Sequence, residues 1–326
     1  MEPIFLFSQP RAGSTLLQKV LSAHSDIFTT AEPWMMLPLS EIWNGRATLS
    51  YYGHDTASSA IKEMFKTRRD SRHAHIGAAR KYANHIYMEA CYGDNPKYFL
   101  DKTPRYYWVI DDIAECFPDS KFIFLLRNPL SILFSMMNAW GGGSYRHMHA
   151  YVDDLLCAPK ILASSIEKYG DRSIVVRYEE FVQNPRSQLN DVMSFLDVSY
   201  EDGMIENFVN VNIQGTLGDD VGDKKYRNIL SNDSVDSWEQ YNINPLRNYV
   251  SMKMLEKIGE EVLSQMGYEY DRLVFKLQGR KKLESSKLLE DIREIGFCIF
   301  KHYTAAAVWK KKIEYKKKYG FPLRLQ

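Results

Sequence analysis

The chain has 326 residues, with 42 basic and 41 acidic side chains and a formal net charge of +1. A content of 45% hydrophobic and 25% charged residues is ordinary for a soluble globular protein and excludes a disordered chain. The nearly neutral total also argues against a surface built to bind nucleic acid. The length suffices for one large domain or two small ones.

The first predicted element is a short apolar strand at Ile4–Phe7, buried on both faces as in a parallel sheet. Apolar residues at helical spacing then predict a helix at Leu16–Leu21. Only Met1–Pro3 precede the strand, without the basic start and longer apolar stretch of a signal peptide. No window reaches the roughly 20 apolar residues that span a bilayer. We therefore expect a cytoplasmic protein.

The segment between this strand and this helix has the composition of an anion-binding loop. Gly13 permits a tight turn, and Ser14 and Thr15 stand at the helix start, where backbone N–H groups favour an anion. Arg11 adds a cation whose forked donors suit phosphate or sulfate oxygens. A plain helix cap is the alternative. The loop lacks the Gly-Lys pair of a Walker A motif, which counts against a nucleotide triphosphatase.

Residues about 40–96 have no clear strand pattern and many polar and aromatic side chains, so we expect a helical insertion there. A second strand follows at Tyr98–Leu100 and leads into Asp101–Arg105, which contains Lys102. Helical spacing resumes at Trp108–Ile113. The four cysteines are widely spaced and without a histidine at ligand spacing, which predicts neither a disulfide framework nor a metal site.

The third predicted strand, Phe122–Leu126, ends at Arg127. A helix from Leu130 to about Ala139 follows and carries Ser135, so Arg127 and Ser135 can converge on one anion. In a P-loop nucleotidase a strand of this sheet would more often end in a Mg²⁺-binding Asp. The alternative pairs Arg127 with a structural carboxylate and leaves Ser135 as a surface hydroxyl.

A fourth strand is predicted at Ile174–Val176 and a helix at Leu189–Leu196. Residues about 212–237, rich in Gly, Asp and Asn, predict a long loop. Residues 276–318 then hold thirteen basic and five acidic side chains, a net charge of +8 against −7 for the rest of the chain. We expect a main domain at residues 1–275 and a basic helical extension at residues 276–326. The extension either packs on the body, which is favoured, or contacts an anionic membrane surface or a partner.

Strands that alternate with helices predict an α/β fold, a P-loop-like three-layer arrangement in which helices flank a central parallel sheet. The helical insertion and the helical C-terminal tail are added to this core. The strand–loop–helix context makes the first loop an anion site, and the cationic end of the third strand suggests a second one.

Two segments carry a resemblance to a known family. Pro10–Leu17, and Arg127–Pro129 with Ser135, resemble the two cofactor motifs of the sulfotransferases that use 3'-phosphoadenosine 5'-phosphosulfate (PAPS). The resemblance implies that the first loop holds the 5'-phosphosulfate and that Arg127 and Ser135 bind the 3'-phosphate. It extends from Ile4 to about Tyr268 and implies PAPS as co-substrate, with no metal. The first-loop residues concerned are Arg11, Ala12, Gly13, Ser14 and Thr15.

The basic residue of the first loop makes the chain more similar to the bacterial group related to protein-tyrosine sulfotransferases. In these enzymes a glutamate is the proposed base, and Glu32 has a similar placement. Asp101–Arg105 resembles their lysine segment near the sulfonate. Val176–Phe181 is similar to a family segment whose tyrosine, here Tyr178, lies near the nucleotide. Family members use a basic or hydroxyl residue late in the chain to close over the nucleotide, and the resemblance implies Arg227 for this role.

Sulfonate transfer requires in-line positioning and charge stabilisation. We expect Arg11 and Lys102 to neutralise the negative charge that develops, and Glu32 to remove the acceptor proton. Surface or capping roles are the alternatives for Glu32, and a solvated loop position is the alternative for Lys102. His24 is a second candidate base, although an interaction with the helix dipole is favoured for it.

The predicted function is therefore sulfonate transfer from PAPS to an acceptor hydroxyl. A glycan, glycolipid or metabolite is favoured as acceptor, with peptide tyrosine second. The alternatives are a small-molecule kinase using ATP and Mg²⁺, and a non-catalytic nucleotide-binding or membrane-docking protein of the same fold. We predict no nucleic-acid partner, and a location in the cytoplasm or at the inner face of the membrane; the sequence leaves the oligomeric state open.

Overall fold

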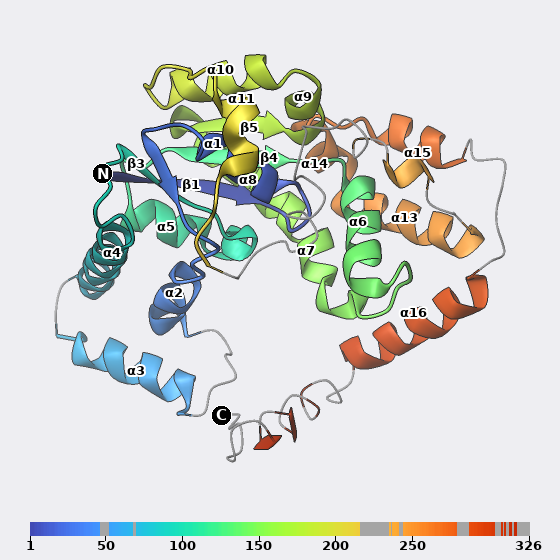
Figure 1. Ribbon diagram of the computed structural model, residues 1–326. Helices are drawn as coiled ribbons and strands as arrows, with labels where there is room; N and C mark the ends of the chain where they lie inside the picture. Colours follow the sequence, from blue (N-terminus) through green and yellow to red (C-terminus); the bar gives the residue numbers. More distant parts are fainter. Residues whose placement is uncertain are drawn as a thin grey trace.

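The protein is described by a computed structural model (Figure 1), which covers residues 1–45, 52–67, 70–215, 235, 237–240, 244–278, 287–303, 308, 310, 313–314 and 316–317. Five parallel strands form one sheet in the order β2-β3-β1-β4-β5. Their bounds are β1 Glu2–Ser8, β2 Ile27–Thr29, β3 Tyr98–Asp101, β4 Phe122–Leu126 and β5 Ser173–Arg177.

All four predicted strands are present, and the predicted α/β fold with a central parallel sheet is confirmed. Strand β1 lies between β3 and β4, with Ile4 opposite Leu100 and Phe5 opposite Phe122. The sequence did not predict β2, because its three residues are too few to show a strand pattern.

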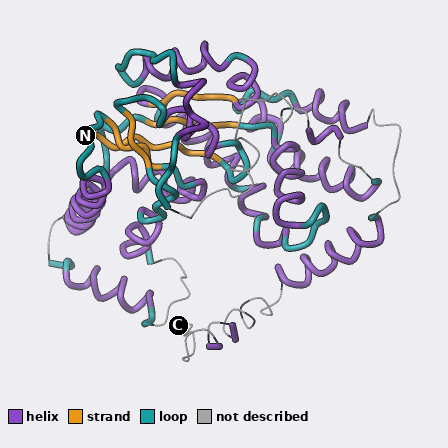
Figure 2. Tube along the Cα trace, viewed as in Figure 1, coloured by secondary structure: helices purple, strands orange, loops and turns teal. Residues whose placement is uncertain are grey.

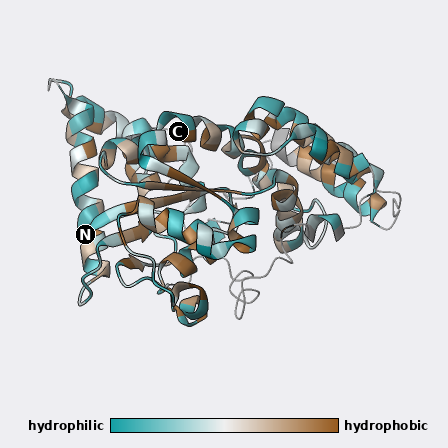
Figure 3. Cartoon of the chain, turned by 90° about the horizontal axis from the view of Figure 1, so that it is seen from above, coloured by the Kyte–Doolittle hydropathy of each residue, from teal (hydrophilic) through white to brown (hydrophobic). Residues whose placement is uncertain are grey.

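Helices cover both faces of the sheet (Figures 1 and 2). Because successive strand residues point to opposite faces, Ile4 and Leu6 belong to one core cluster and Phe5 and Phe7 to the other. The strands are accordingly among the most hydrophobic segments in Figure 3. The first cluster packs on α1 Ser14–Leu21, α6 Pro129–Gly141, α9 Tyr178–Gln183 and α10 Pro185–Phe195, and the second on α4 Ser71–Ala90, α5 Ile110–Cys116 and α8 Ala158–Lys168.

The predicted insertion is helical throughout its described part. Between residues 52 and 96 the described residues form helices and turns but no strand. Helix α3 lies at the edge of the molecule in Figure 1. The helices of this region are α2 Met36–Asn44, α3 His54–Met64 and α4.

The second half of the chain adds α7 Val152–Leu156, α11 Met204–Asn207, α13 Pro245–Ile258, α14 Glu260–Gln265, α15 Tyr270–Gln278 and α16 Leu288–Tyr303. Short 3₁₀ helices lie at Pro104–Val109, Met148–Ala150, Gly170–Arg172, Phe208–Asn210 and Ser237–Gln240.

Helix α16, in the predicted basic extension, packs on α13 through a buried ion pair. The Arg247 guanidinium lies 2.7 Å from the Asp291 carboxylate, with side chains 3% and 0% exposed. Asn244 donates a second hydrogen bond of 2.7 Å to Asp291. Removing one partner from such a pair leaves a buried, uncompensated charge. The pair therefore fixes α16 on the body of the protein.

Candidate active site

The carboxyl end of every strand leads to one of the predicted site residues. Arg11 follows β1, Glu32 follows β2, Lys102 directly follows β3, Arg127 directly follows β4 and Tyr178 directly follows β5. Because the strands are parallel, these ends meet at one edge of the sheet. Open parallel sheets bind their ligands at this edge.

The first loop presses closely against the segment that follows β5. Gly13 has a φ of 97°, and a Cβ placed on it would lie 2.5 Å from two ring carbons of Tyr178. Arg11 also has a positive φ, 69°, which is uncommon outside glycine and costs conformational energy. The loop is thus held in a conformation that brings its backbone against the Tyr178 ring.

Two arginines converge on this loop. The Arg11 Nε donates a hydrogen bond of 3.2 Å to the Ser135 Oγ, and the Arg127 Nη1 donates one of 2.9 Å to the Arg11 carbonyl. The Arg127 guanidinium also lies 4.3 Å above the Tyr178 ring centre. The structure therefore joins the two predicted cofactor motifs through direct contacts. Guanidinium groups gathered with hydroxyls suit an anionic ligand with several oxygens.

A second cluster joins β2 and β3 to the start of α1. The Lys102 Nζ lies 2.8 Å from the Glu32 Oε1 and donates a longer contact of 3.4 Å to the Thr15 Oγ1. Lys102 is 1% exposed and the Glu32 side chain 12% exposed. The ammonium is thus buried beside the anion-binding loop, in direct contact with the candidate base.

Sequence reasoning missed Trp34, which holds the other oxygen of Glu32. Its indole N–H donates a hydrogen bond of 3.0 Å to the Glu32 Oε2. Its backbone has a φ of 58° and donates to the Thr103 hydroxyl at 3.3 Å. The only sequence signal was a tryptophan two positions after the candidate base, which by itself gives no orientation. Both carboxylate oxygens of Glu32 are therefore fixed, one by Lys102 and one by Trp34.

Replacing Trp34 by phenylalanine is expected to lower kcat about 10- to 150-fold, since a hydrogen bond to a charged group contributes about 1.5–3 kcal/mol. Steady-state kinetics should show the loss in kcat with little change in the KM for the anionic co-substrate. In a Glu32→Gln background the same change should have no further effect. Trp108→Phe is a matched control, because the two tryptophans are 37% and 38% exposed. An equal loss in both variants would contradict a positioning role.

An aromatic pair lies beside the loop and was also missed. Trp140 and Tyr151 stack with ring centres 4.3 Å apart. Arg11 lies 5.9 Å from the Trp140 ring and Arg105 lies 5.9 Å from the Tyr151 ring. Arg105 in turn forms a 2.8 Å ion pair with the buried Asp154. The stack connects the first loop with the segment after β3, and only the fold brings these residues together.

Asp101, the last residue of β3 and the neighbour of Lys102 in the chain, is fully buried. It accepts hydrogen bonds of 2.6 Å from the Tyr87 hydroxyl and 3.3 Å from the Tyr106 hydroxyl. Burial raises the pKa of Asp101 to about 7, although these hydrogen bonds and Lys102 oppose the shift. In an unfolded chain its pKa would be about 3.9.

This difference makes stability dependent on pH. Between about pH 4 and pH 7 the unfolded chain ionises Asp101 before the folded protein does, so the stability contributed by this group falls as pH rises. We expect Asp101→Asn to raise the melting temperature relative to wild type at pH 8 but not at pH 4. Exposed Asp94→Asn serves as control. The same difference from wild type at both pH values would contradict this assignment.

Of the remaining predicted site residues, two are described by the structure and one is not. Ala12 and Ser14 are buried in the first loop, at 0% and 4% exposure. Arg227 lies outside the described residues. Within the described part of the chain, no group of three His, Cys, Asp or Glu side chains could hold a metal ion.

Curated relatives of the chain include several sulfotransferases. The nodulation protein NoeE of Sinorhizobium fredii is 27% identical over 81% of this chain and 65% of its own length. A putative protein-tyrosine sulfotransferase of Caenorhabditis briggsae is 23% identical over 72% of this chain and 80% of its own length. The protein-tyrosine sulfotransferase of Drosophila melanogaster is 23% identical over 64% of this chain and 41% of its own length. The chain thus spans less than two thirds of NoeE and of the Drosophila enzyme.

Solved structures share the fold. A sulfotransferase domain from the curacin biosynthetic pathway has a TM-score of 0.50 at 22% identity, over 82% of this chain and 99% of that domain. The sulfotransferase domain of the Synechococcus PCC 7002 olefin synthase has a TM-score of 0.50 at 19% identity, over 78% and 93%. A family model described as "Sulfotransferase family" matches residues 3–202, which is more than half of the chain. The chain therefore belongs to the sulfotransferase family, as the two motifs predicted.

Proposed function

We propose that the protein transfers a sulfonate group from PAPS to a hydroxyl of an acceptor. The observation that carries the proposal is the direct contact between the two motifs, in which Arg127 binds the Arg11 carbonyl and Arg11 binds Ser135. A buried Lys102–Glu32 pair lies beside them. Family membership supports the same activity. PAPS, when bound, supplies the sulfonate.

The residues of the first loop fit an anionic co-substrate. Their side chains are a guanidinium and two hydroxyls, and Gly13 keeps the backbone open where a Cβ would collide with Tyr178. We assign Arg11, Ser14 and Thr15 to the 5'-phosphosulfate. The proposed 3'-phosphate ligands are Arg127 and Ser135, with Tyr178 and Ala12 lining the site and Arg227 as a closing residue.

Glu32 and Lys102 divide the chemistry between them. Glu32 is the proposed general base: its Oε1, which also contacts the Lys102 ammonium, accepts the proton of a hydroxyl while Trp34 orients Oε2. Lys102 and Arg11 are cations at the place where negative charge builds up as the bond to the phosphate breaks. The burial of Lys102 strengthens this effect, since water screens it little.

The acceptor is proposed to be a glycan, glycolipid or metabolite hydroxyl, with peptide tyrosine second. The helical insertion, α2 to α4, is the segment proposed to form much of its pocket. Two relatives named as protein-tyrosine sulfotransferases are 23% identical to this chain. Their names support peptide tyrosine as the second proposed acceptor.

The decisive experiment incubates the protein with PAPS and representatives of each acceptor class, and mass spectrometry detects a gain of one sulfonate. Glu32→Gln should retain binding of PAP, the desulfonated product, and lose about 10²- to 10⁴-fold in turnover. Thermal shift with PAP against ATP·Mg²⁺ separates the kinase alternative. Stabilisation by ATP·Mg²⁺ alone would overturn the proposal. Binding of PAP without turnover on any class, and with no effect of Glu32→Gln, would favour the non-catalytic alternative.

We also propose that the protein, in the cytoplasm, contacts the inner face of the membrane through α16. The face of α16 that points away from its buried Asp291 carries Leu289 and Phe300, which are 83% and 56% exposed. Apolar side chains that gather on an exposed surface mark sites of contact with a partner or a membrane. The net charge of +8 over residues 276–318 matches an anionic lipid surface. No helix of the described residues has the length and hydrophobicity to cross a membrane.

Sedimentation with lipid vesicles tests this contact. We expect binding to vesicles that contain anionic phosphatidylglycerol, weaker binding to neutral phosphatidylcholine, and a further loss in high salt. The double variant Leu289→Glu with Phe300→Glu should lower the bound fraction at least fivefold, because it places charges on the apolar face. Equal binding by the variant and the wild type would refute the proposed surface, as would a stable dimer that the variant disrupts.

A further inference from the structure

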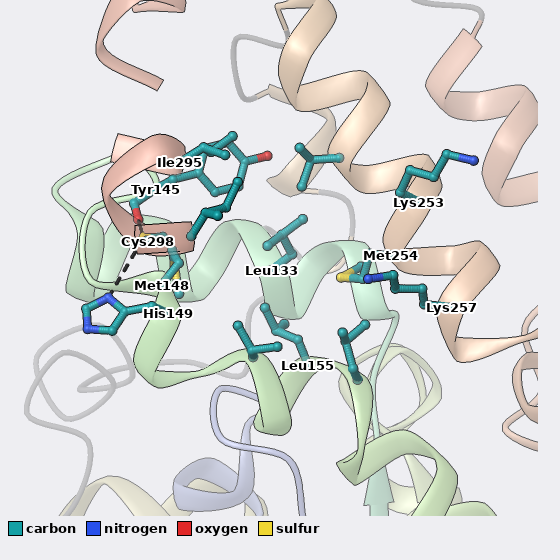
Figure 4. A pocket seen from close by; sticks show the side chains of 14 residues that line it. Leu133, Tyr145, Met148, His149, Leu155, Lys253, Met254, Lys257, Ile295 and Cys298 are labelled. Atoms are coloured by element: carbon teal, nitrogen blue, oxygen red, sulfur yellow. Dashed lines mark hydrogen bonds between the residues drawn. The ribbon is translucent and has the colours of Figure 1, made fainter. Parts of the chain in front are cut away.

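A cavity of about 320 Å³ lies between α6, α7, α13 and α16 (Figure 4). The cavity opens to solvent, since its lining includes the exposed side chains of Lys253, Lys257 and Ile299, the last of them 54% exposed. The volume lies at the lower end of the range for small-ligand pockets, about 300–1,000 Å³. Its fourteen lining residues are Leu133, Tyr145, Met148, His149, Val152, Leu155, Leu156, Val250, Lys253, Met254, Lys257, Ile295, Cys298 and Ile299.

The cavity is separate from the candidate active site. Leu133 on α6 faces the cavity, whereas Ser135 on the same helix contacts Arg11. Two residues in a helix differ by about 200° in direction, so the two side chains point to opposite sides of α6. The cavity is therefore not an extension of the first loop.

The lining is apolar in the middle and cationic at one side. Leu133 and Leu155 lie in the middle of Figure 4. Lys253 and Lys257 lie at one side, where the Lys257 ammonium points toward Met254 and the Lys253 ammonium points away from the cavity. These lysines are four residues apart on α13, so they lie on one face of the helix. No aspartate or glutamate is among the fourteen lining residues, all of which the structure describes, although Lys253 also pairs with Glu256 at the surface. The cavity thus combines an apolar body with a positively charged rim.

The opposite side is bounded by α16 and the segment around the Met148–Ala150 turn. The Cys298 thiol contacts the Tyr145 carbonyl at 3.2 Å and the His149 ring at 3.8 Å. The Arg247–Asp291 ion pair holds α16 in place. Since both walls are anchored, the cavity is a formed feature of the fold.

We propose that this cavity binds a single-chain alkyl carboxylate, a fatty acid of medium length. The alkyl chain lies against the leucine, valine and methionine side chains, where it leaves water. The carboxylate lies at the rim, where Lys257 supplies the opposite charge. One chain suits the volume, whereas a two-chain lipid requires more space. The proposal does not depend on sulfonate transfer, since it uses none of the residues assigned to that reaction.

Dodecanoate below its micelle concentration is the probe, with binding measured by calorimetry and by the rise in melting temperature. We expect saturable one-to-one binding, with dodecanol and butyrate each at least tenfold weaker. Leu133→Trp fills the cavity and should weaken binding at least tenfold. If that variant folds poorly, Val250→Phe fills the cavity from the α13 wall.

Two further variants locate the ligand. Lys253→Ala with Lys257→Ala should weaken dodecanoate binding about tenfold and leave dodecanol binding unchanged, while exposed Lys160→Ala has no effect. Leu289→Glu with Phe300→Glu, on the outer face of α16, should bind dodecanoate like wild type. Unchanged binding in the cavity-filling variants would overturn the proposal, and so would equal binding of dodecanoate and dodecanol.

Discussion

Replacing Lys102 by methionine is expected to lower kcat by about 10²- to 10³-fold, the range seen when a group that stabilises transition-state charge is removed. Methionine keeps much of the length and the apolar stem of the side chain but loses the ammonium. That ammonium lies 2.8 Å from Glu32 and 3.4 Å from the Thr15 hydroxyl, at 1% exposure. Single-turnover measurements with saturating PAPS should show the loss, and calorimetry should show PAP affinity within a few-fold of wild type.

A double variant distinguishes a chemical role of Lys102 from a structural one. If Lys102 acts only by holding Glu32, the combination with Glu32→Gln should be no slower than Glu32→Gln alone. We expect the combination to be slower, because the base and the cation act on different atoms of the reaction. Lys160→Met, an exposed change on α8, controls for the loss of a lysine. A Lys102→Met variant with unchanged kcat would remove this residue from the mechanism.

Gly13→Ala is expected to have the largest effect on the structure of the site. The new Cβ would lie 2.5 Å from two carbons of the Tyr178 ring, and a φ of 97° strains any residue other than glycine. Strain and overpacking each contribute about 1–3 kcal/mol of destabilisation. Tyr178 cannot move without disturbing Arg127, which stacks on it at 4.3 Å. We therefore expect a lower melting temperature and at least a hundredfold weaker PAP binding.

Gly77→Ala is the matched control for this prediction. Gly77 lies in α4, has nothing within 4 Å of an added Cβ and has no positive φ. Alanine there should be neutral or stabilising by about 0.5–1 kcal/mol, since it is the better helix former. Calorimetry with PAP and thermal unfolding of both variants provide the comparison. If the two alanine variants behave alike, the close contact with Tyr178 has no role in forming the site.

The sequence predicted those parts of the fold that depend on local patterns. Four strands show as apolar runs, and Gly13 and Arg127 follow two of them in a recognisable context. Strand β2 was not predicted because it has only three residues, which all pair with β3, and a run that short shows no periodicity. Ile27–Thr29 form a strand because they pair with β3, and the residues Ile27–Thr29 alone give no sign of that pairing.

The site was predictable only where a residue immediately follows a strand or stands in a motif. The structure places Arg11 in contact with Ser135, and Lys102 in contact with Glu32. The roles of these four residues remain predictions. Trp34 and the stacked pair Trp140 and Tyr151 were not predicted, because their orientation arises from tertiary packing.

The distribution of the site over all five strands has a consequence for folding. No single hairpin or helix pair contains even half of its residues, and each parallel strand pair needs a long crossover before it can form. Such contacts between distant segments form slowly, because loop closure precedes the gain from pairing. Binding of PAP during refolding should accordingly appear only in the last phase, when the sheet is complete, so that nucleotide affinity reports the integrity of the whole sheet.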